Sequence, residues 1–204
     1  MTLKNKIIIG GAHMGQIILD NIKKSEFYGF LDDNKKVKNN IGELSDISKF
    51  KKKSFIIAIA NPHIRARLFK YLIDNKFKLF NCISKFSHVS KSSKIGKGIF
   101  VDNFVKIYPF ANIKDGAAIF SHSAIGTYCK ISENTIISPK CSFASNTSIG
   151  KNCFIGAGVT VQEHIKIGNN CFIAAGEIVR IIGHQMSGSG IIYFNPSPDF
   201  IEVS

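Results

Sequence analysis

The stretch Thr147-Ser148-Ile149-Gly150-Lys151-Asn152-Cys153-Phe154-Ile155-Gly156 contains one six-residue pattern almost twice. A small residue is followed by a variable one, an aliphatic one and glycine, and the aliphatic position recurs six residues later. Followed in both directions, this position keeps its phase from residue 89 to residue 179, and Phe143 is its one non-aliphatic member. The positions are Val89, Ile95, Val101, Ile107, Ile113, Ile119, Ile125, Ile131, Ile137, Phe143, Ile149, Ile155, Val161, Ile167, Ile173 and Val179.

A second column of mostly small residues lies two positions before each aliphatic one, for example Cys129, Thr135 and Cys141. Residues i−2 and i of a strand share a face, so both columns are expected to point inward. Glycine often follows the aliphatic residue, as at Gly126 and Gly150, where we expect a corner with backbone angles that glycine adopts easily. Three such units would close a triangular coil, and coils would stack as parallel strands about 4.8 Å apart.

This pattern resembles the hexapeptide-repeat acyltransferases. The resemblance implies a left-handed parallel β-helix, an exception to the usual right-handed crossover. It also implies a homotrimer with acyl-CoA bound in the grooves between subunits. We predict the β-helix over residues 85–182, followed by a C-terminal tail over 183–204. Four of the five cysteines fall in the small inward column and are expected to fill the core as free thiols.

Residues 1–84 show a different pattern, in which strands and helices alternate. An apolar strand ends at Ile9, the turn Gly10-Gly11-Ala12-His13-Met14-Gly15 follows, and a helix is expected over 16–24. A second strand, 28–31, ends at Asp32-Asp33, and an apolar strand over 54–60 precedes a helix over about 64–75. This order is typical of a mononucleotide-binding unit, so we predict a small α/β Rossmann-like domain of three or four strands.

The glycine spacing of the turn is not the dinucleotide fingerprint Gly-x-Gly-x-x-Gly. A plain tight turn before a helix explains it as well as a ligand site does. A helix N-terminus can bind phosphate or hydroxyl oxygens, and acids at a strand end can accept hydrogen bonds from sugar hydroxyls. The domain is too short for a second half, so a nucleotide or nucleotide sugar fits it better than NAD.

The two parts together are similar to the bacterial sugar acetyltransferases of the bacillosamine, perosamine and sialic acid pathways. The resemblance covers nearly the whole chain and implies that the front domain binds a nucleotide-linked amino sugar. The motifs that carry it are Phe30-Leu31-Asp32-Asp33, Phe55-Ile56-Ile57-Ala58-Ile59-Ala60-Asn61, Ile64-Arg65 and Lys151-Asn152-Cys153-Phe154-Ile155-Gly156. The substrate-binding residues that it implies are Gly11, Ala12, His13, Met14, Asp32, Asp33 and Ala60.

Acylation of an amine needs a positioned thioester, an unprotonated amine and stabilisation of the tetrahedral oxyanion. Members of the family use a histidine as general base beside an acid, and those positions match Thr127 and Tyr128 here. Three hypotheses remain open. Another corner histidine could be the base, either His122 or His164 beside Glu163. The amine could bind already neutral, held by Thr127 or Tyr128. Finally, catalysis could be lost, or the acyl group could differ.

The resemblance also implies acetyl-CoA, or another acyl-CoA, as co-substrate. The cofactor-binding positions that it implies lie in the later coils, except that Ile136 matches a second histidine of the family. They are Ile136, Ala157, Gly158, Ala175, Gly176 and Arg180. No metal is expected, because the five cysteines include no Cys-x-x-Cys pair.

The chain has 204 residues and a formal net charge of +13, from 27 Lys and Arg against 14 Asp and Glu. Lysine is spread along the chain, whereas a nucleic-acid binder usually clusters its basic residues and interleaves aromatics. Compositional drift and a polyphosphate ligand both explain the charge, and a nucleic-acid partner is not expected. No signal-peptide pattern or membrane-spanning stretch is visible, which favours a cytoplasmic protein.

The leading hypothesis is therefore an acyl-CoA-dependent N-acyltransferase for surface glycan biosynthesis. Its substrate would be the amino group of a nucleotide-linked 4-amino-4,6-dideoxy sugar. One alternative is O-acetylation of a sugar, as in sialic acid modification, which the missing histidine disfavours because a hydroxyl needs a base more. The other is a non-catalytic binding or assembly protein on the same scaffold.

Overall fold

The computed structural model describes residues 4–180 and 191–192. The chain divides into two compact units, which are described separately here. The first contains the chain up to Ile83 together with Lys97–Phe100, and the second contains Ser84–Gly96 and the chain from Val101 onward. The predicted tail over 183–204 lies outside the described residues, apart from the short strand Ile191–Ile192.

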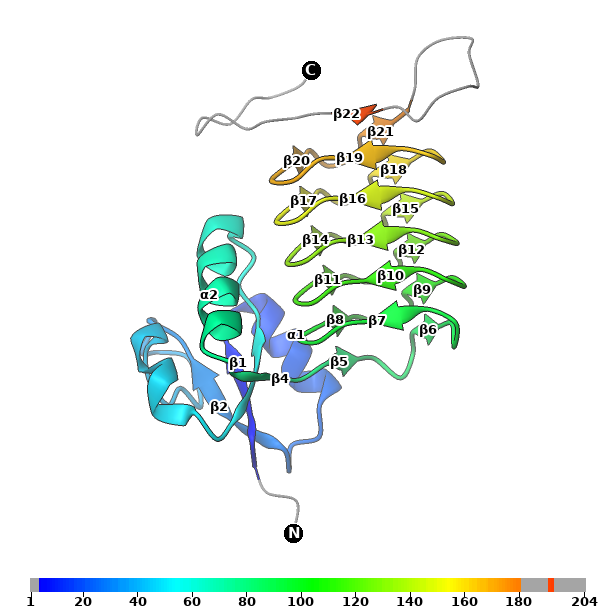
Figure 1. Cartoon of the computed structure of the whole chain (residues 1–204). Helices are drawn as coiled ribbons and strands as arrows, with labels where there is room; N and C mark the ends of the chain where they lie inside the picture. Colours follow the sequence, from blue (N-terminus) through cyan, green and yellow to red (C-terminus); the bar gives the residue numbers. More distant parts are fainter. Residues whose placement is uncertain (1–3, 181–190, 193–204) are drawn as a thin grey trace. The chain divides into compact units, whose positions relative to one another are not determined.

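The first unit is a parallel four-stranded sheet in the order β2-β1-β3-β4. It confirms the predicted α/β class (Figure 1). Its elements are β1 (Lys6–Ile9), α1 (His13–Asn21), β2 (Phe27–Leu31), the 3₁₀ helix η1 (Leu44–Phe50), β3 (Ser54–Ile57), α2 (Pro62–Asp74) and β4 (Lys78–Leu79). Strands β1, β2 and β3 are mostly apolar, and the sheet, η1 and α2 enclose a core that includes Ile9, Leu31, Ile57 and Leu72.

Several element boundaries differ from the sequence prediction, and two of these differences matter for function. Helix α1 begins at His13, three residues earlier than expected, because the glycine turn already leads into the first helical turn. Strand β3 ends at Ile57, three residues earlier than expected, so Ala58, Ile59 and Ala60 form a loop instead of strand. The first correction places His13 and Met14 in the first turn of α1, and the second moves Ala58–Ala60 out of the strand, so both segments lie beyond the carboxyl ends of the strands.

The second unit is a left-handed parallel β-helix, as predicted, with two-residue strands stacked in three sheets (Figure 1). The first sheet, β22-β19-β16-β13-β10-β7, contains β7 (Lys94–Ile95), β10 (Asn112–Ile113), β13 (Lys130–Ile131), β16 (Ser148–Ile149), β19 (Lys166–Ile167) and β22 (Ile191–Ile192). The second, β20-β17-β14-β11-β8-β5, contains β5 (Cys82–Ile83), β8 (Phe100–Val101), β11 (Ala118–Ile119), β14 (Ile136–Ile137), β17 (Phe154–Ile155) and β20 (Phe172–Ile173). The third, β21-β18-β15-β12-β9-β6, contains β6 (His88–Val89), β9 (Lys106–Ile107), β12 (Ala124–Ile125), β15 (Ser142–Phe143), β18 (Thr160–Val161) and β21 (Ile178–Val179).

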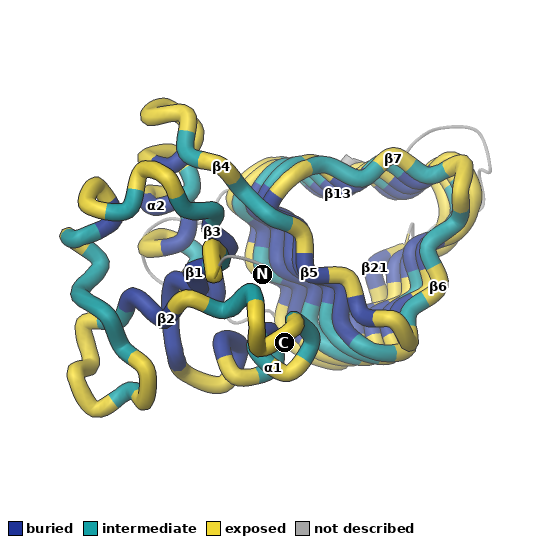
Figure 2. Tube along the Cα trace, turned by 90° about the horizontal axis from the view of Figure 1, so that it is seen from below, coloured by how far each residue is buried: buried dark blue, intermediate teal, exposed yellow. Residues whose placement is uncertain are grey.

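The aliphatic column points inward along the whole stack. Each member is the second residue of its strand, and up to Val161 it pairs with the residue eighteen positions later, as Ile131 pairs with Ile149. From Val101 to Val179 all of these side chains are buried. Figure 2 views the stack end-on and shows successive coils superposed. The six-residue period therefore determines which residues form the core and which lie outside.

The small inward column has a bonding role besides its size. Thr135 Oγ1 donates to the carbonyl of Gly150 at 2.7 Å, and Cys153 Sγ donates to that of Gly168 at 3.1 Å. Both carbonyls lie fifteen residues later, in the next coil, so the buried polar atoms are satisfied between coils. Burial raises the pKa of Cys153 to about 12, so its thiol stays protonated and unreactive at neutral pH.

The corner glycines were explained wrongly by the sequence argument. Gly150 and Gly156 do not adopt positive φ. A Cβ at Gly150 would instead collide with the carbonyl of Gly168 in the neighbouring coil. The positive φ falls three residues after each inward aliphatic position and recurs every six residues from Gly98 to Gly176. The glycines after the aliphatic column are therefore required by close stacking, not by left-handed backbone geometry.

Neither α1 nor α2, the helices found in the described part of the chain, has the length and hydropathy needed to cross a membrane.

Candidate functional site

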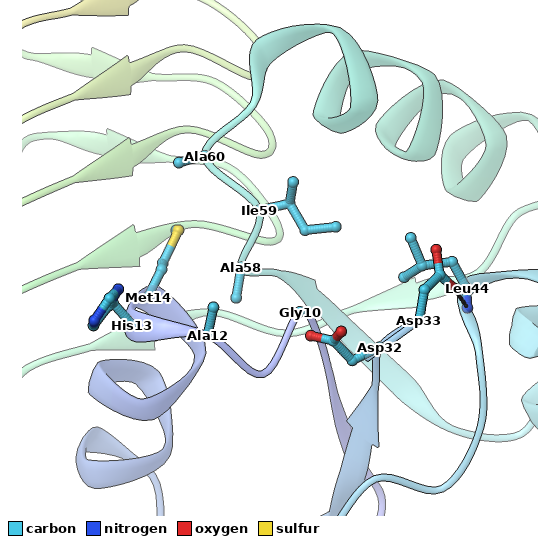
Figure 3. A pocket seen from close by; sticks show the side chains of 10 residues that line it. All are labelled: Gly10, Ala12, His13, Met14, Asp32, Asp33, Leu44, Ala58, Ile59 and Ala60. Atoms are coloured by element: carbon cyan, nitrogen blue, oxygen red, sulfur yellow. Dashed lines mark hydrogen bonds between the residues drawn. The ribbon is translucent and has the colours of Figure 1, made fainter. Parts of the chain in front are cut away.

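The first unit contains a pocket of about 320 Å³ at the carboxyl ends of β1, β2 and β3. Ligands of open α/β sheets bind at this edge. Figure 3 shows that the lining comes from four places: the glycine turn with the start of α1, the end of β2, the start of η1, and the loop after β3. The lining residues are Gly10, Ala12, His13, Met14, Asp32, Asp33, Leu44, Ala58, Ile59 and Ala60.

The glycine turn lets three backbone segments approach one another beside this pocket. Gly10 has φ +99°, and a Cβ there would lie 2.8 Å from the carbonyl oxygen of Ala58. A Cβ at Gly15 would collide with the carbonyl of Gly10. Packing alone thus requires both glycines, and the same packing brings the beginning of α1 against the β3–α2 loop.

The N-terminus of α1 differs from that of α2 in how its amides are used. At α2, Asn61 Oδ1 accepts hydrogen bonds from the backbone amides of His63 and Ile64, at 3.1 and 3.0 Å. At α1 the N-cap residue is Ala12, which has no side-chain acceptor. Backbone amides at an uncapped helix start can bind an anion, and the helix dipole favours negative charge there. The α1 start lines the pocket, so this capacity is available at the pocket.

The carboxylates of the two pocket aspartates accept hydrogen bonds from backbone amides. Asp32 accepts from the amide of Gly11 through Oδ2 at 2.7 Å and from that of Asn34 through Oδ1 at 2.8 Å. Asp33 accepts from the amide of Leu44 through Oδ1 at 2.9 Å. Asp32 therefore ties the glycine turn to the end of β2, and Asp33 ties down the start of η1. A carboxylate oxygen has a second lone pair, so both can still accept a bond from a ligand hydroxyl.

The structure brings most of the predicted substrate-binding residues together. Ala12, His13, Met14, Asp32, Asp33 and Ala60 all line the pocket. Gly11 does not line it, and its amide is directed at Asp32 instead. Sequence reasoning did not select Gly10, Leu44, Ala58 or Ile59. Gly10 and Ala58 lie within the quoted motifs and could have been selected, whereas Leu44 reaches the pocket only through η1, for which no sequence signal was recognised.

The predicted catalytic residues lie at two different corners of the β-helix. His122 lies between β11 and β12, whereas Thr127 and Tyr128 lie between β12 and β13. His122 and Tyr128 both occupy the left-handed position, with φ of 60° and 61°, and both are exposed. The imidazole lies 5.0 Å from the ring of Phe104, and the Tyr128 ring stacks on Phe110 at 5.0 Å.

Exposed aromatic side chains at positive φ are unusual, because this region favours glycine and asparagine. The third corner of the coils shows the common solution, a ladder of Asn134, Asn152 and Asn170 linked by side-chain hydrogen bonds of 3.0 and 3.3 Å. The corners that carry His122 and Tyr128 instead hold exposed rings at this backbone conformation.

The predicted cofactor residues of the last coils form a bare backbone ledge, which we define as Ala157, Gly158, Ala175 and Gly176. All four are exposed, and the amide of Gly176 donates to the carbonyl of Ala157 at 2.8 Å. Among the residues that the structure describes, no atom would lie within 4 Å of a Cβ at Gly176. The ledge lies on the same corner of the β-helix as His122. Positions 122, 140, 158 and 176 are eighteen residues apart, which is one full coil, and all have positive φ.

The other two predicted cofactor residues lie apart from the ledge. Ile136 is the first residue of β14, and its side chain is only 2% exposed, which leaves little surface for a ligand. Arg180 is exposed and is the last residue of the continuous described segment.

Two protein-family models match the chain, one for each unit. The PglD N-terminal domain matches residues 5–72, and the bacterial transferase hexapeptide matches residues 128–163 and 146–176. This chain belongs to the bacterial hexapeptide-repeat nucleotide-sugar acetyltransferase family. Membership makes it an acyltransferase by class.

Solved structures share the fold of this family member over most of its length. The acetyltransferase domain of PglB from Neisseria gonorrhoeae matches with a TM-score of 0.80 and 22% identity, covering 87% of this chain and 91% of the other. PerB from Caulobacter crescentus, in complex with CoA and GDP-perosamine, matches with a TM-score of 0.79 and 23% identity, covering 86% and 88%.

A curated relative matches part of this acyltransferase. An uncharacterized protein of Acanthamoeba polyphaga mimivirus is 32% identical over 117 residues, which is 53% of this chain and 23% of that protein. The chain thus spans about a quarter of the length of this relative.

Asp32 accepts backbone hydrogen bonds through both carboxylate oxygens and Asp33 through one, so replacing each by asparagine should affect stability differently. Asp32→Asn leaves one side-chain acceptor where the turn uses two, so we expect the free energy of unfolding to fall by about 1–2 kcal/mol. Asp33→Asn keeps the single acceptor that Leu44 needs, so its effect should stay within about 0.5 kcal/mol. Urea denaturation followed by circular dichroism measures both, and equal losses would contradict the assigned roles.

Proposed function

We propose that this protein transfers an acyl group, in the simplest case acetyl, from acyl-CoA to the amino group of a nucleotide-linked 4-amino-4,6-dideoxy sugar. The observation that carries the proposal is the pocket at the uncapped start of α1, in a chain whose other unit is a hexapeptide-repeat acyltransferase. The pocket offers a nucleotide site, and the β-helix offers an acyl-donor site.

The pocket suits a nucleoside diphosphate for three reasons. The α1 start supplies backbone amides for phosphate oxygens. Asp32 and Asp33 can accept bonds from hydroxyl or base N–H groups at the end of β2. Leu44 and Ile59 add apolar surface of the kind that a base ring requires. PerB, which shares the fold, is a perosamine N-acetyltransferase solved with GDP-perosamine, which supports the choice of an amino-sugar nucleotide.

The ledge suits an extended acyl-CoA chain. Glycine and alanine place no bulky side chain over its backbone, so a thin ligand can approach it, and within the described part of the chain a Cβ at Gly176 would meet no atom within 4 Å. PerB and the gonococcal PglB domain were each solved with a coenzyme A species, which supports acyl-CoA as the donor. We propose that the protein acts as a homotrimer, so that the ledge of one subunit faces a corner of the next.

The reaction forms one C–N bond and breaks one C–S bond. The sugar amine attacks the thioester carbonyl, the tetrahedral oxyanion collapses, and the CoA thiolate leaves and takes up a proton. The nitrogen must lose one proton, and we assign its removal to His122, which lies on the same corner column as the ledge. Thr127 and Tyr128, where the family has its histidine and acid, are then available to hold the amine or the oxyanion through their hydroxyls.

The direct test incubates the protein with acetyl-CoA and UDP-, dTDP- or GDP-linked 4-amino-4,6-dideoxy sugars. We expect release of the CoA thiol with one of the three, and a product heavier by one acetyl group in mass spectrometry. The matched sugar with a 4-hydroxyl should give no product. Ala175→Phe, which fills the ledge, should raise the KM for acetyl-CoA while leaving nucleotide binding unchanged. No thiol release with any of the three would overturn the proposal.

The assignment of the base makes a separate prediction. His122→Gln should lower kcat by about 100-fold or more, because general-base catalysis contributes 10²–10⁴. The KM of both substrates should stay within about threefold. His164→Gln, also at a corner and at φ 62°, is the control and should keep full activity. A kcat for His122→Gln within threefold of the wild type would show that the amine binds already neutral.

A further inference from the structure

A fully buried arginine lies on the inward face of α2, at a position where an amphipathic helix usually has an apolar residue such as leucine. The inward face of α2 consists of Arg65, Leu68 and Leu72, which follow the spacing of a buried helical stripe. Leu68 and Leu72 pack in the core of the sheet. Arg65 is 1% exposed, the most completely buried charged side chain among the described residues.

The guanidinium binds the backbone of the segment that follows β3. Its Nη1 donates to the carbonyl of Ile57 at 2.6 Å and, at longer range, to that of Ile59 at 3.4 Å. Ile57 is the last residue of β3, and Ile59 lies in the middle of the three-residue loop Ala58–Ala60. All three loop residues line the pocket. The arginine thus binds the last residue of β3 and the middle of the loop that forms a pocket wall.

Burial of this cation opposes folding stability. Desolvation lowers the pKa of Arg65 to about 10, so the group remains charged at neutral pH at the expense of its hydration. Buried charges seldom stabilise a fold relative to apolar side chains of similar volume. A methionine or leucine would continue the apolar stripe of α2. The residue is therefore better explained by what its charge and its donors do for the pocket.

We propose that Arg65 is the positioning residue of the nucleotide-sugar pocket. It holds the carbonyls of Ile57 and Ile59 so that Ala58–Ala60 keep the shape of the wall, and it adds fixed positive charge behind a site that takes a diphosphate. The proposal rests on the proposed function, since it assumes that a nucleoside diphosphate occupies this pocket. A planar group with several N–H donors meets both demands, whereas lysine keeps the charge but offers a single ammonium.

The test compares four variants of the full chain. Arg65→Met removes the charge and the donors but keeps an unbranched stem, and Arg65→Lys restores the charge alone. Arg67→Met is the matched control, because Arg67 lies on the same helix but is exposed. Leu68→Ala destabilises the same buried stripe without touching either carbonyl. The Kd for UDP, dTDP and GDP is measured by calorimetry, and the KM for the sugar nucleotide and for acetyl-CoA by thiol release.

For Arg65→Met we expect the Kd of the bound nucleotide and the KM of the sugar nucleotide to rise about tenfold, the effect of one charged hydrogen bond. The KM for acetyl-CoA should stay within twofold, and Arg65→Lys should recover part of the loss. Arg67→Met should match the wild type, and Leu68→Ala should lose thermal stability with an unchanged Kd.

Two results would overturn the proposal, and they have different meanings. The role of Arg65 alone fails if the wild type binds a nucleotide and Arg65→Met binds it equally well, or if Leu68→Ala weakens nucleotide binding as much as Arg65→Met does. In either case Arg65 has a purely structural role, and the proposed function stands. If the wild type binds none of the three nucleotides, the assignment of the pocket fails, and the role of Arg65 fails with it.

Discussion

Each coil of the β-helix depends on contact between an inward aliphatic side chain and its counterpart eighteen residues later. Ile113, Ile131 and Ile149 form one such column, and each is buried. Because side chains alternate between the two faces of a strand, a slip of one residue would turn the whole column outward. The apolar column therefore fixes the register of all three sheets and, with it, the position of every corner. As a consequence, exposed residues that are eighteen positions apart lie above one another along the stack.

Both candidate ligand sites use backbone more than side chains. At the pocket, close packing of Gly10 and Gly15 brings an uncapped helix start to the strand ends. At the ledge, Gly158 and Gly176 leave the backbone of two successive coils uncovered. Side chains then act on these backbone segments, as Asp32 does on the glycine turn and Arg65 on the loop after β3. Rigid elements that present backbone groups in this way pre-organise a site before a ligand arrives.

The sequence predicted the parts of the structure that repeat or follow simple periodicity. The phase of the aliphatic column, the α/β order of the first unit and the residues at its strand ends were all visible in it. It did not predict contacts made across distant segments. Leu44 reaches the pocket because η1 folds back on Asp33, and the glycines of the repeat proved to serve coil stacking because of neighbours eighteen residues away. Arg65 was visible only as part of a motif, since its burial depends on how α2 packs.

We propose that the two units bind two different ligands, a nucleoside diphosphate in the first and acyl-CoA in the second. Hydrogen–deuterium exchange, with each ligand added separately to the same preparation, distinguishes the two sites. The nucleotide should slow exchange in residues 10–14, 32–34 and 57–61, and CoA should slow exchange around the ledge, in residues 156–158 and 174–177. Protection of the same segments by both ligands, or of neither set by either ligand, would contradict it.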